Sequence, residues 1–143
     1  MVDASFVGKA LPPSAPYRVS REKVREFALA IGEGASVCLD VAAARAAGHP
    51  DVVAPPTFCV TFTMPLIEAF LRDPAFGWDY ARMVHGDQSI TLHRPVFAGD
   101  ELVIDAEVVN VDRELGRVEV RTRVMRGGDG VGCEGRTLVS ADV

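Results

Sequence analysis

The sequence predicts an α+β fold in which an antiparallel sheet wraps around a buried central helix. Residues 53–71 are apolar with the spacing of a helix. From residue 84 onward, apolar and polar residues alternate instead, which is the period of half-buried strands. All the expected helices precede this alternating region, and such segregation favours α+β over a parallel α/β sheet.

Length and composition agree with one domain over residues 1–143, because 48% hydrophobic residues are enough to build a core. The net charge is −5 and the charges are scattered, so we expect no nucleic acid and no anionic membrane surface as a partner. The beginning of the chain has no basic segment followed by an apolar one, which predicts no secretory signal.

The three cysteines have no CxxC spacing, which predicts buried thiols in a reducing cytoplasm. No set of His, Cys, Asp and Glu residues has metal-ligand spacing, and no glycine loop after a strand could hold a phosphate. We therefore expect neither a metal nor a cofactor.

The first part of the chain should contain an arm and two helices. Residues 1–16 hold three prolines and should form the arm. Ser20 is the expected N-cap of the first helix, and Gly32 should end it. The apolar stripe of this helix is formed by Val24, Phe27, Ala28 and Ile31. Residues 33–39 should be a loop, after which Asp40 can cap a short helix from Val41 to Ala47.

The central segment runs from Val53 to Leu71 and is apolar nearly all round. The Pro55–Pro56 pair suits the start of a helix, whereas Pro65 predicts a kink or a second helix that begins there. The segment is long enough to be considered as a membrane span. Its three prolines, three threonines and one glutamate argue against that interpretation and for a buried helix.

The sheet should follow a loop at residues 73–79. The first strand contains Val84, Ile90 and Leu92 and ends at Arg94–Pro95. Three further strands are predicted at residues 102–108, 118–124 and 131–139, separated by turns rich in glycine. Strands of this kind are polar on one face, and their apolar face needs cover, which the central helix can provide.

Three stretches carry a resemblance to a known family: Gly32 to Asp40, Val53 to Phe58, and His93-Arg-Pro-Val-Phe-Ala-Gly-Asp100. With the order of the elements, they resemble the hot-dog fold of the MaoC-like dehydratase family over residues 6–139. The chain is most similar to the N-terminal-type branch, which includes the non-catalytic subunit of actinobacterial (3R)-hydroxyacyl-ACP dehydratase heterodimers. The resemblance implies substrates that are 3-hydroxyacyl or trans-2-enoyl thioesters of coenzyme A or acyl carrier protein.

The family signature Gly-Asp-x-Asn-Pro-Leu-His-x-Asp aligns with Gly32 to Asp40. On this alignment Glu33 stands at the catalytic aspartate, Ala35 at the asparagine and Cys38 at the catalytic histidine. Dehydration needs an acid and a base with pKa values near neutrality, and a cysteine is a poor substitute for histidine. Glu33 could still serve as a base, and Asp40 and His85 are weak candidates for a catalytic role.

The family also uses a glycine N–H at the start of the central helix to stabilise the enolate oxygen. Pro56 occupies this position and has no N–H, and loss of one such donor typically lowers the rate by about 10²–10³. The resemblance further implies that the same region borders the acyl tunnel. The substrate-binding residues that it implies are Ala54, Pro56, Thr57, Phe58, Cys59 and Phe62. The last three of these fit a purely structural core equally well.

The leading hypothesis is the non-catalytic, acyl-chain-binding half of an (R)-specific 3-hydroxyacyl-thioester dehydratase, with a catalytic hot-dog partner. Two alternatives stay open from the sequence. One is an acyl-thioester binding protein without chemistry, and the other is a self-sufficient homodimeric hydratase or thioesterase that uses Glu33. In each case we expect a homodimer or heterodimer, because a single such sheet leaves a long edge strand unpaired.

Overall fold

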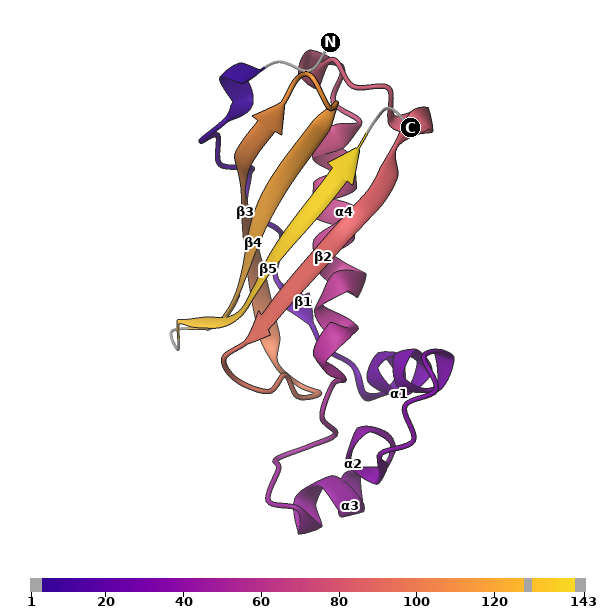
Figure 1. The fold of residues 1–143 in the computed structure, drawn as a ribbon. Helices are drawn as coiled ribbons and strands as arrows, with labels where there is room; N and C mark the ends of the chain where they lie inside the picture. Colours follow the sequence, from indigo (N-terminus) through magenta and orange to yellow (C-terminus); the bar gives the residue numbers. More distant parts are fainter. Residues whose placement is uncertain (1–3, 128–129, 141–143) are drawn as a thin grey trace.

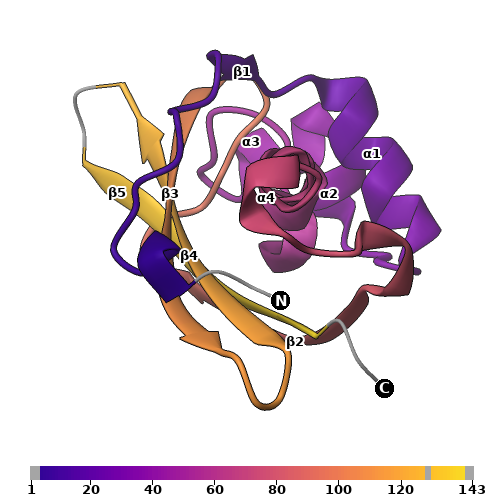
Figure 2. The ribbon, with the colours of Figure 1, turned by 90° about the horizontal axis from the view of Figure 1, so that it is seen from above.

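A five-stranded antiparallel sheet curls around one central helix in the computed structural model, which describes residues 4–127 and 130–140 (Figures 1 and 2). The strand order is β1-β3-β4-β5-β2. The strands are β1 (Tyr17–Arg18), β2 (Val84–Leu92), β3 (Glu101–Asp112), β4 (Arg117–Arg126) and β5 (Val131–Ser140). The predicted α+β arrangement and the four long strands are confirmed.

The inner face of the sheet follows the predicted alternation. Ile104 of β3 pairs with Val124 of β4, and both side chains are buried against the helix side. The residues that alternate with these apolar ones along β3 and β4 point outward. They pair across the strands, for example through a hydrogen bond of 3.0 Å from Arg123 Nε to Asp105 Oδ1. A sheet that is apolar on one face and charged on the other is held in register by this contrast.

The central helix consists of a 3₁₀ turn, η2 (Pro56–Cys59), followed by α4 (Val60–Leu71). The predicted start at the two prolines is confirmed. Of the two alternatives predicted at Pro65, a second helix that begins there is wrong because α4 runs through this residue, and the kink stays a prediction. Pro65 is exposed, so the carbonyl that loses its partner lies on the solvent side of the helix. Burial of Ile67 and Phe70 on the opposite side outweighs that loss.

Three short helices lie beyond one end of the sheet: α1 (Arg21–Ala30), α2 (Ser36–Leu39) and α3 (Val41–Ala46). Both predicted caps are present, since the side chains of Ser20 and Asp40 accept hydrogen bonds from Lys23 N and Ala43 N. The prediction of a loop at residues 33–39 is wrong for its second half. There the chain makes one helical turn, which carries a buried cysteine inward.

The first helix is shorter than its apolar stripe. Ile31 is the C-cap of α1 and is half exposed, so its predicted place in the buried stripe is wrong. Val24 and Ala28 of the same stripe are fully buried. The neighbouring Leu29 is also exposed, which leaves two large apolar side chains on the surface at this end of the molecule.

The N-terminal arm continues the sheet beyond β1. Its backbone is hydrogen-bonded to β3 through Gly8 N to Val108 O (2.8 Å) and Leu11 N to Ala106 O (2.8 Å). The arm begins with a 3₁₀ turn, η1 (Ala4–Phe6), and Figure 2 shows it running alongside β3. The edge of the sheet at β1 and β3 is thus covered by the chain itself.

The opposite edge of the sheet is β2. Two 3₁₀ turns, η3 (Pro74–Phe76) and η4 (Tyr80–Arg82), lead from α4 into this strand, within and just after the loop predicted at residues 73–79. Most residues of β2 are exposed, and in the described part of the chain only β5 pairs with it. This long strand is the free edge of the sheet.

Candidate active site

The three short helices and the start of the central helix come together, as the family signature requires. Val53 N donates to Val37 O at 3.0 Å, which joins α2 to the segment that leads into η2. The rings of Phe27 in α1 and Phe58 in η2 meet edge to face, with centroids 5.5 Å apart. The structure therefore brings the residue 33–40 segment next to the first turn of the central helix.

An ion pair fixes this arrangement from the other side. The guanidinium of Arg21 binds Asp51 with two hydrogen bonds of 2.9 and 2.7 Å. The pKa of Asp51 is lowered to about 2, chiefly by these hydrogen bonds from Arg21. The pair connects the first residue of α1 to the loop just before the central helix.

Neither carboxylate of the aligned signature is directed to a catalytic partner. Glu33 Oε1 accepts a hydrogen bond from Ala35 N at 2.9 Å, and so stabilises the turn after α1. Asp40 Oδ1 accepts from Ala43 N at 2.7 Å and caps α3. Both side chains thus have a local backbone role that accounts for their presence.

Cys38, at the histidine position, is buried, with an exposed fraction of 5%. Burial and the nearby charge of Glu33 raise the pKa of its thiol above the ordinary value. A thiol in this state stays protonated at neutral pH and is a poor base and a poor nucleophile. The structure therefore gives Cys38 the environment of a core residue.

The start of the central helix lacks donors where the family places them. Pro56 is exposed and has no N–H, and Phe58 N donates to Pro55 O at 2.9 Å. Thr57 lies between them and is exposed. An enolate oxygen placed at this turn could receive no hydrogen bond from either Pro56 or Phe58.

The other predicted substrate-binding residues lie inside the molecule. Ala54, Phe58, Cys59 and Phe62 are all buried in the core cluster that joins η2 to β3, β4 and β5. Phe62 stacks at a tilt on Tyr17 of β1, with ring centroids 4.8 Å apart. In the isolated chain these side chains pack as core, and their role in acyl binding stays a prediction.

Cys59 also faces a second buried thiol. A hydrogen bond with Cys133 of β5, together with burial, raises the pKa of Cys59, whereas the same hydrogen bond lowers that of Cys133. The thiol of Cys133 also donates a hydrogen bond to the backbone carbonyl of Glu134, with 3.8 Å between sulfur and oxygen. This thiol pair joins the central helix to the sheet.

His85 lies on the edge strand β2 and is exposed. The register of β2 against β5 shifts between His85 and Asp87, so Gly86 forms an irregularity in the strand. No described contact joins His85 to the residue 33–40 segment. His93 forms a different contact, because its Nε2 lies 3.2 Å from Glu134 Oε2 at the other end of β2.

Sequence reasoning missed a groove of about 560 Å³ between the arm and α4. Its walls are the arm residues 9–15 on one side and Leu66, Ala69 and Phe70 on the other, with Asp73 at one end. The sequence predicts a proline-rich arm but not its pairing with a strand. Its pairing with β3, which creates the groove, depends on backbone hydrogen bonds that no local sequence pattern reveals.

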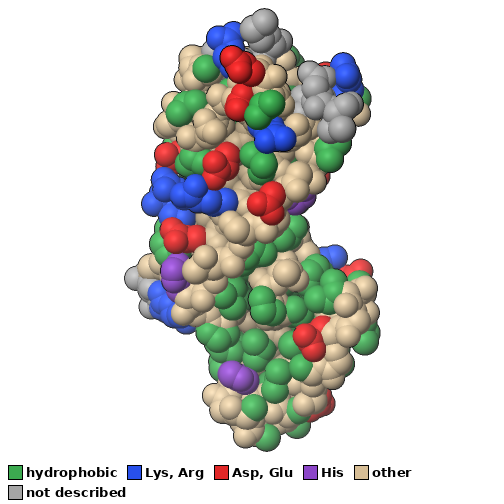
Figure 3. All heavy atoms as spheres, viewed as in Figure 1, with side chains coloured by type: hydrophobic (Ala, Val, Ile, Leu, Met, Phe, Trp, Pro, Cys, Tyr) green, Lys and Arg blue, Asp and Glu red, His purple; other side chains and the backbone are tan. Residues whose placement is uncertain are grey.

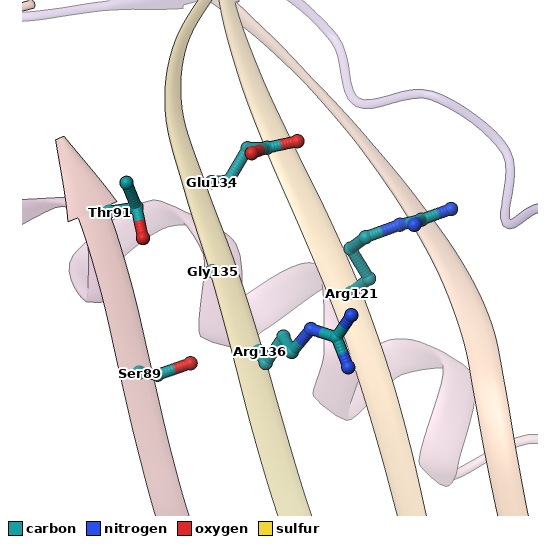
Figure 4. A pocket seen from close by; sticks show the side chains of 6 residues that line it. All are labelled: Ser89, Thr91, Arg121, Glu134, Gly135 and Arg136. Carbon is teal, nitrogen blue, oxygen red and sulfur yellow. The ribbon is translucent and has the colours of Figure 1, made fainter. Parts of the chain in front are cut away.

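A smaller hollow of about 180 Å³ lies on the outer face of the sheet (Figure 4). Its lining residues come from β2, β4 and β5 and are Ser89, Thr91, Arg121, Glu134, Gly135 and Arg136. The two arginines face each other across the strands but are each paired with a carboxylate, Glu107 at 2.7 Å and Glu119 at 2.8 Å. The charges in this hollow are therefore already compensated.

Residues 4–127 and 130–140 contain no cluster of three or more His, Cys, Asp or Glu residues that could hold a metal ion. Over the same described ranges, no helix has the length and apolar character needed to cross a membrane.

The chain is similar to known proteins in both sequence and structure. The family model described as "FAS1-like, dehydratase domain region" matches residues 5–134. A UPF0336 protein of Parafrankia sp. (strain EAN1pec) is 50% identical over 119 residues, which cover 83% of this chain and 78% of that protein. The match therefore extends over most of both chains.

Two solved structures share the fold. The C-terminally truncated HadBC (3R-hydroxyacyl-ACP dehydratase) complex from Mycobacterium tuberculosis gives a TM-score of 0.83 at 26% identity, covering 94% of this chain and 96% of that one. A MaoC-like dehydratase gives a TM-score of 0.87 at 32% identity, covering 97% of this chain but 43% of the longer chain. The predicted hot-dog fold and the resemblance to MaoC-like dehydratases are confirmed. The chain belongs to the family of FAS1-like dehydratase domain regions.

Proposed function

We propose that this chain is the acyl-chain-binding, catalytically incomplete half of an (R)-specific 3-hydroxyacyl-thioester dehydratase. The observation that carries the proposal is that every aligned catalytic position has a structural role instead. Cys38 is a buried, protonated thiol, Glu33 and Asp40 bind backbone N–H groups, and Pro56 has no N–H to donate. An acid–base pair must then come from another chain.

The surface near this site supports a partner subunit. Leu29 and Ile31 are 66% and 50% exposed at the end of α1, close to the residue 33–40 segment. Figure 3 shows hydrophobic side chains gathered over the lower part of the molecule, whereas charged ones lie mainly over the sheet. Exposed apolar surface beside a degraded site favours a complex in which a second hot-dog subunit covers both.

The structurally similar Mycobacterium tuberculosis protein is a dehydratase complex. By analogy, the substrate here would be a 3-hydroxyacyl or enoyl thioester of coenzyme A or acyl carrier protein, and the enzyme complex would act in the cytoplasm. The partner would supply the aspartate and histidine, while this chain would contribute binding surface for the acyl group.

The test is hydration of enoyl thioesters by the pure chain and by the chain co-expressed with a hot-dog subunit that retains Gly-Asp-x-Asn-x-x-His. We expect little or no activity from the pure chain and full activity from the complex. A control is Glu33→Ala, which should leave the activity of the complex unchanged because Glu33 bonds only Ala35 N. A pure chain with ordinary activity that Glu33→Ala abolishes would instead establish the self-sufficient hydratase.

A further inference from the structure

The groove between the arm and α4 has the size and lining of a small-molecule site. Its volume of about 560 Å³ lies within the range of roughly 300–1,000 Å³ that is usual for ligand pockets. Leu11 and Phe70 form a buried apolar base, and Ala69, with its small exposed side chain, leaves the space above them open. An apolar, elongated ligand matches this lining.

The walls of the groove are held in place before any ligand arrives. On the arm, Leu11 N donates to Ala106 O at 2.8 Å and Ser14 N donates to Ile104 O at 2.9 Å. Ser14 Oγ also accepts a hydrogen bond from Ile104 N at 3.0 Å. A preformed apolar site binds without the cost of ordering its own walls.

Most N–H groups of these walls already have partners, and this helps to decide which kind of ligand the groove suits. The N–H groups of Leu11 and Ser14 are bound to β3, that of Lys9 is bound to Phe6 O, and Pro12 and Pro13 have none. Apart from the carbonyl that lacks a partner because of Pro65, the backbone of α4 is bonded within the helix. A peptide strand in the groove would bury carbonyl groups beside walls that offer few N–H donors, whereas an alkyl chain has no polar group to satisfy.

The polar end of a ligand has a defined place. Asp73 follows α4 by two residues, and the Lys9 ammonium lies 4.2 Å over the ring of Phe6, which contacts Phe70. Both charged residues therefore lie towards the C-terminal end of α4. The opposite end of the groove, at Ala15 and Leu66, is apolar.

We propose that this groove binds a straight fatty-acyl chain, with its carboxylate end beside the Lys9 ammonium and its tail directed towards Leu66. The site goes beyond the proposed function, because its mouth lies at the end of α4 away from Pro56 and the residue 33–40 segment. It requires no catalytic partner and no turnover, so it stands or falls independently of the dehydratase proposal.

The experiment is calorimetric titration of the pure chain with saturated fatty acids from octanoate to myristate, and with the corresponding alcohols. Affinity should rise about fourfold for each added methylene, as expected for burial of apolar surface, until the groove is filled. Methyl NMR should show shifts at Leu11 and Leu66 and none at Leu102, which lies in the other core cluster. Affinity that does not depend on chain length would overturn the proposal.

A matched pair of variants tests whether the ligand binds in this groove. Ala69→Trp should fill the groove and weaken binding at least tenfold, whereas Ala42→Trp, on the exposed surface of α3, should leave affinity unchanged. If Ala69→Trp does not fold, the smaller Ala69→Leu takes its place. Equal affinities for the two variants would overturn the proposal. So would an Ala69 substitution that splits a dimer without affecting fatty-acid binding, since the groove would then be an interface between copies.

Discussion

At the scale of single residues, the segment from Gly32 to Asp40 has the length of the family signature, while its side chains make local structural contacts. Glu33 and Asp40 keep carboxylates at or next to the family positions, but each one serves a backbone N–H within three residues of itself. Cys38 fills a small buried volume where a histidine would need polar partners for both ring nitrogens. Removal of the histidine therefore lets this turn pack as apolar core.

The Arg21–Asp51 pair gives a prediction for the effect of pH. Because the pKa of Asp51 falls from 3.8 to about 2 on folding, the pair should stabilise the protein fully above pH 3.8. That contribution should disappear as the pH falls towards 2 and the carboxylate gains a proton. The measurement is urea denaturation of the wild type and of Asp51→Asn across this range. The wild type should be more stable at neutral pH, and the gap should close in acid. A gap that does not change with pH would show that the charge of Asp51 contributes nothing.

At the scale of elements, the central helix α4 contains a proline in its interior. Pro65 lies on the exposed side of α4, where its ring removes one hydrogen bond but disturbs no buried contact. Pro65→Ala should restore that bond, which is worth about 3 kcal/mol for a proline in a helix interior. Alanine also leaves the unfolded chain more conformational freedom than proline does, and this should reduce the gain in unfolding free energy by up to about 1 kcal/mol.

The expected net effect of Pro65→Ala is thus a stabilisation of about 2 kcal/mol, read from chemical denaturation. Ala69→Gly, at an exposed position of the same helix, is the matched control and should destabilise by about 1 kcal/mol. A destabilised Pro65→Ala variant would contradict this account of the helix.

The elements also show which parts of the structure the sequence could predict. Strong periodicity predicted the sheet and the central helix, and the caps at Ser20 and Asp40 predicted two helix starts. The turn of helix at residues 36–39 was missed, because it depends on tertiary burial of Cys38 and not on local propensity. The groove was missed for the same kind of reason, since it requires the arm to pair with a strand about 90 residues later.

The family signature singled out segments that the structure brings together, but it could not predict the contacts that each side chain makes there. The alignment identified Glu33, Cys38 and Pro56, and the structure brings their segments together. That Glu33 bonds the backbone and that Cys38 is buried are three-dimensional facts without a sequence signal. His85 lies on the irregular part of the edge strand β2, away from these segments, and its catalytic role stays a prediction.

At the scale of the whole molecule, one edge of the sheet is covered by the arm and the other is exposed. The β1–β3 edge is covered by the arm, which hydrogen-bonds to β3 from Gly8 to Ser14. The β2 edge is nine residues long and has large apolar side chains at both of its ends, with Val84 47% and Leu92 36% exposed. An uncovered edge of this length is a template for pairing with another chain.

We therefore expect the chain to assemble through β2, either with a second copy or with a related subunit. Sedimentation of the pure protein at micromolar concentration should show a dimer. Leu92→Lys should convert it to a monomer, because a lysine on an edge strand must be desolvated when another strand docks beside it. Leu115→Lys is the control, since Leu115 is comparably exposed, at 51%, but lies in the turn between β3 and β4. A wild-type monomer would contradict assembly with a second copy, and an equal effect of the two lysines on the dimer would contradict assembly through this edge.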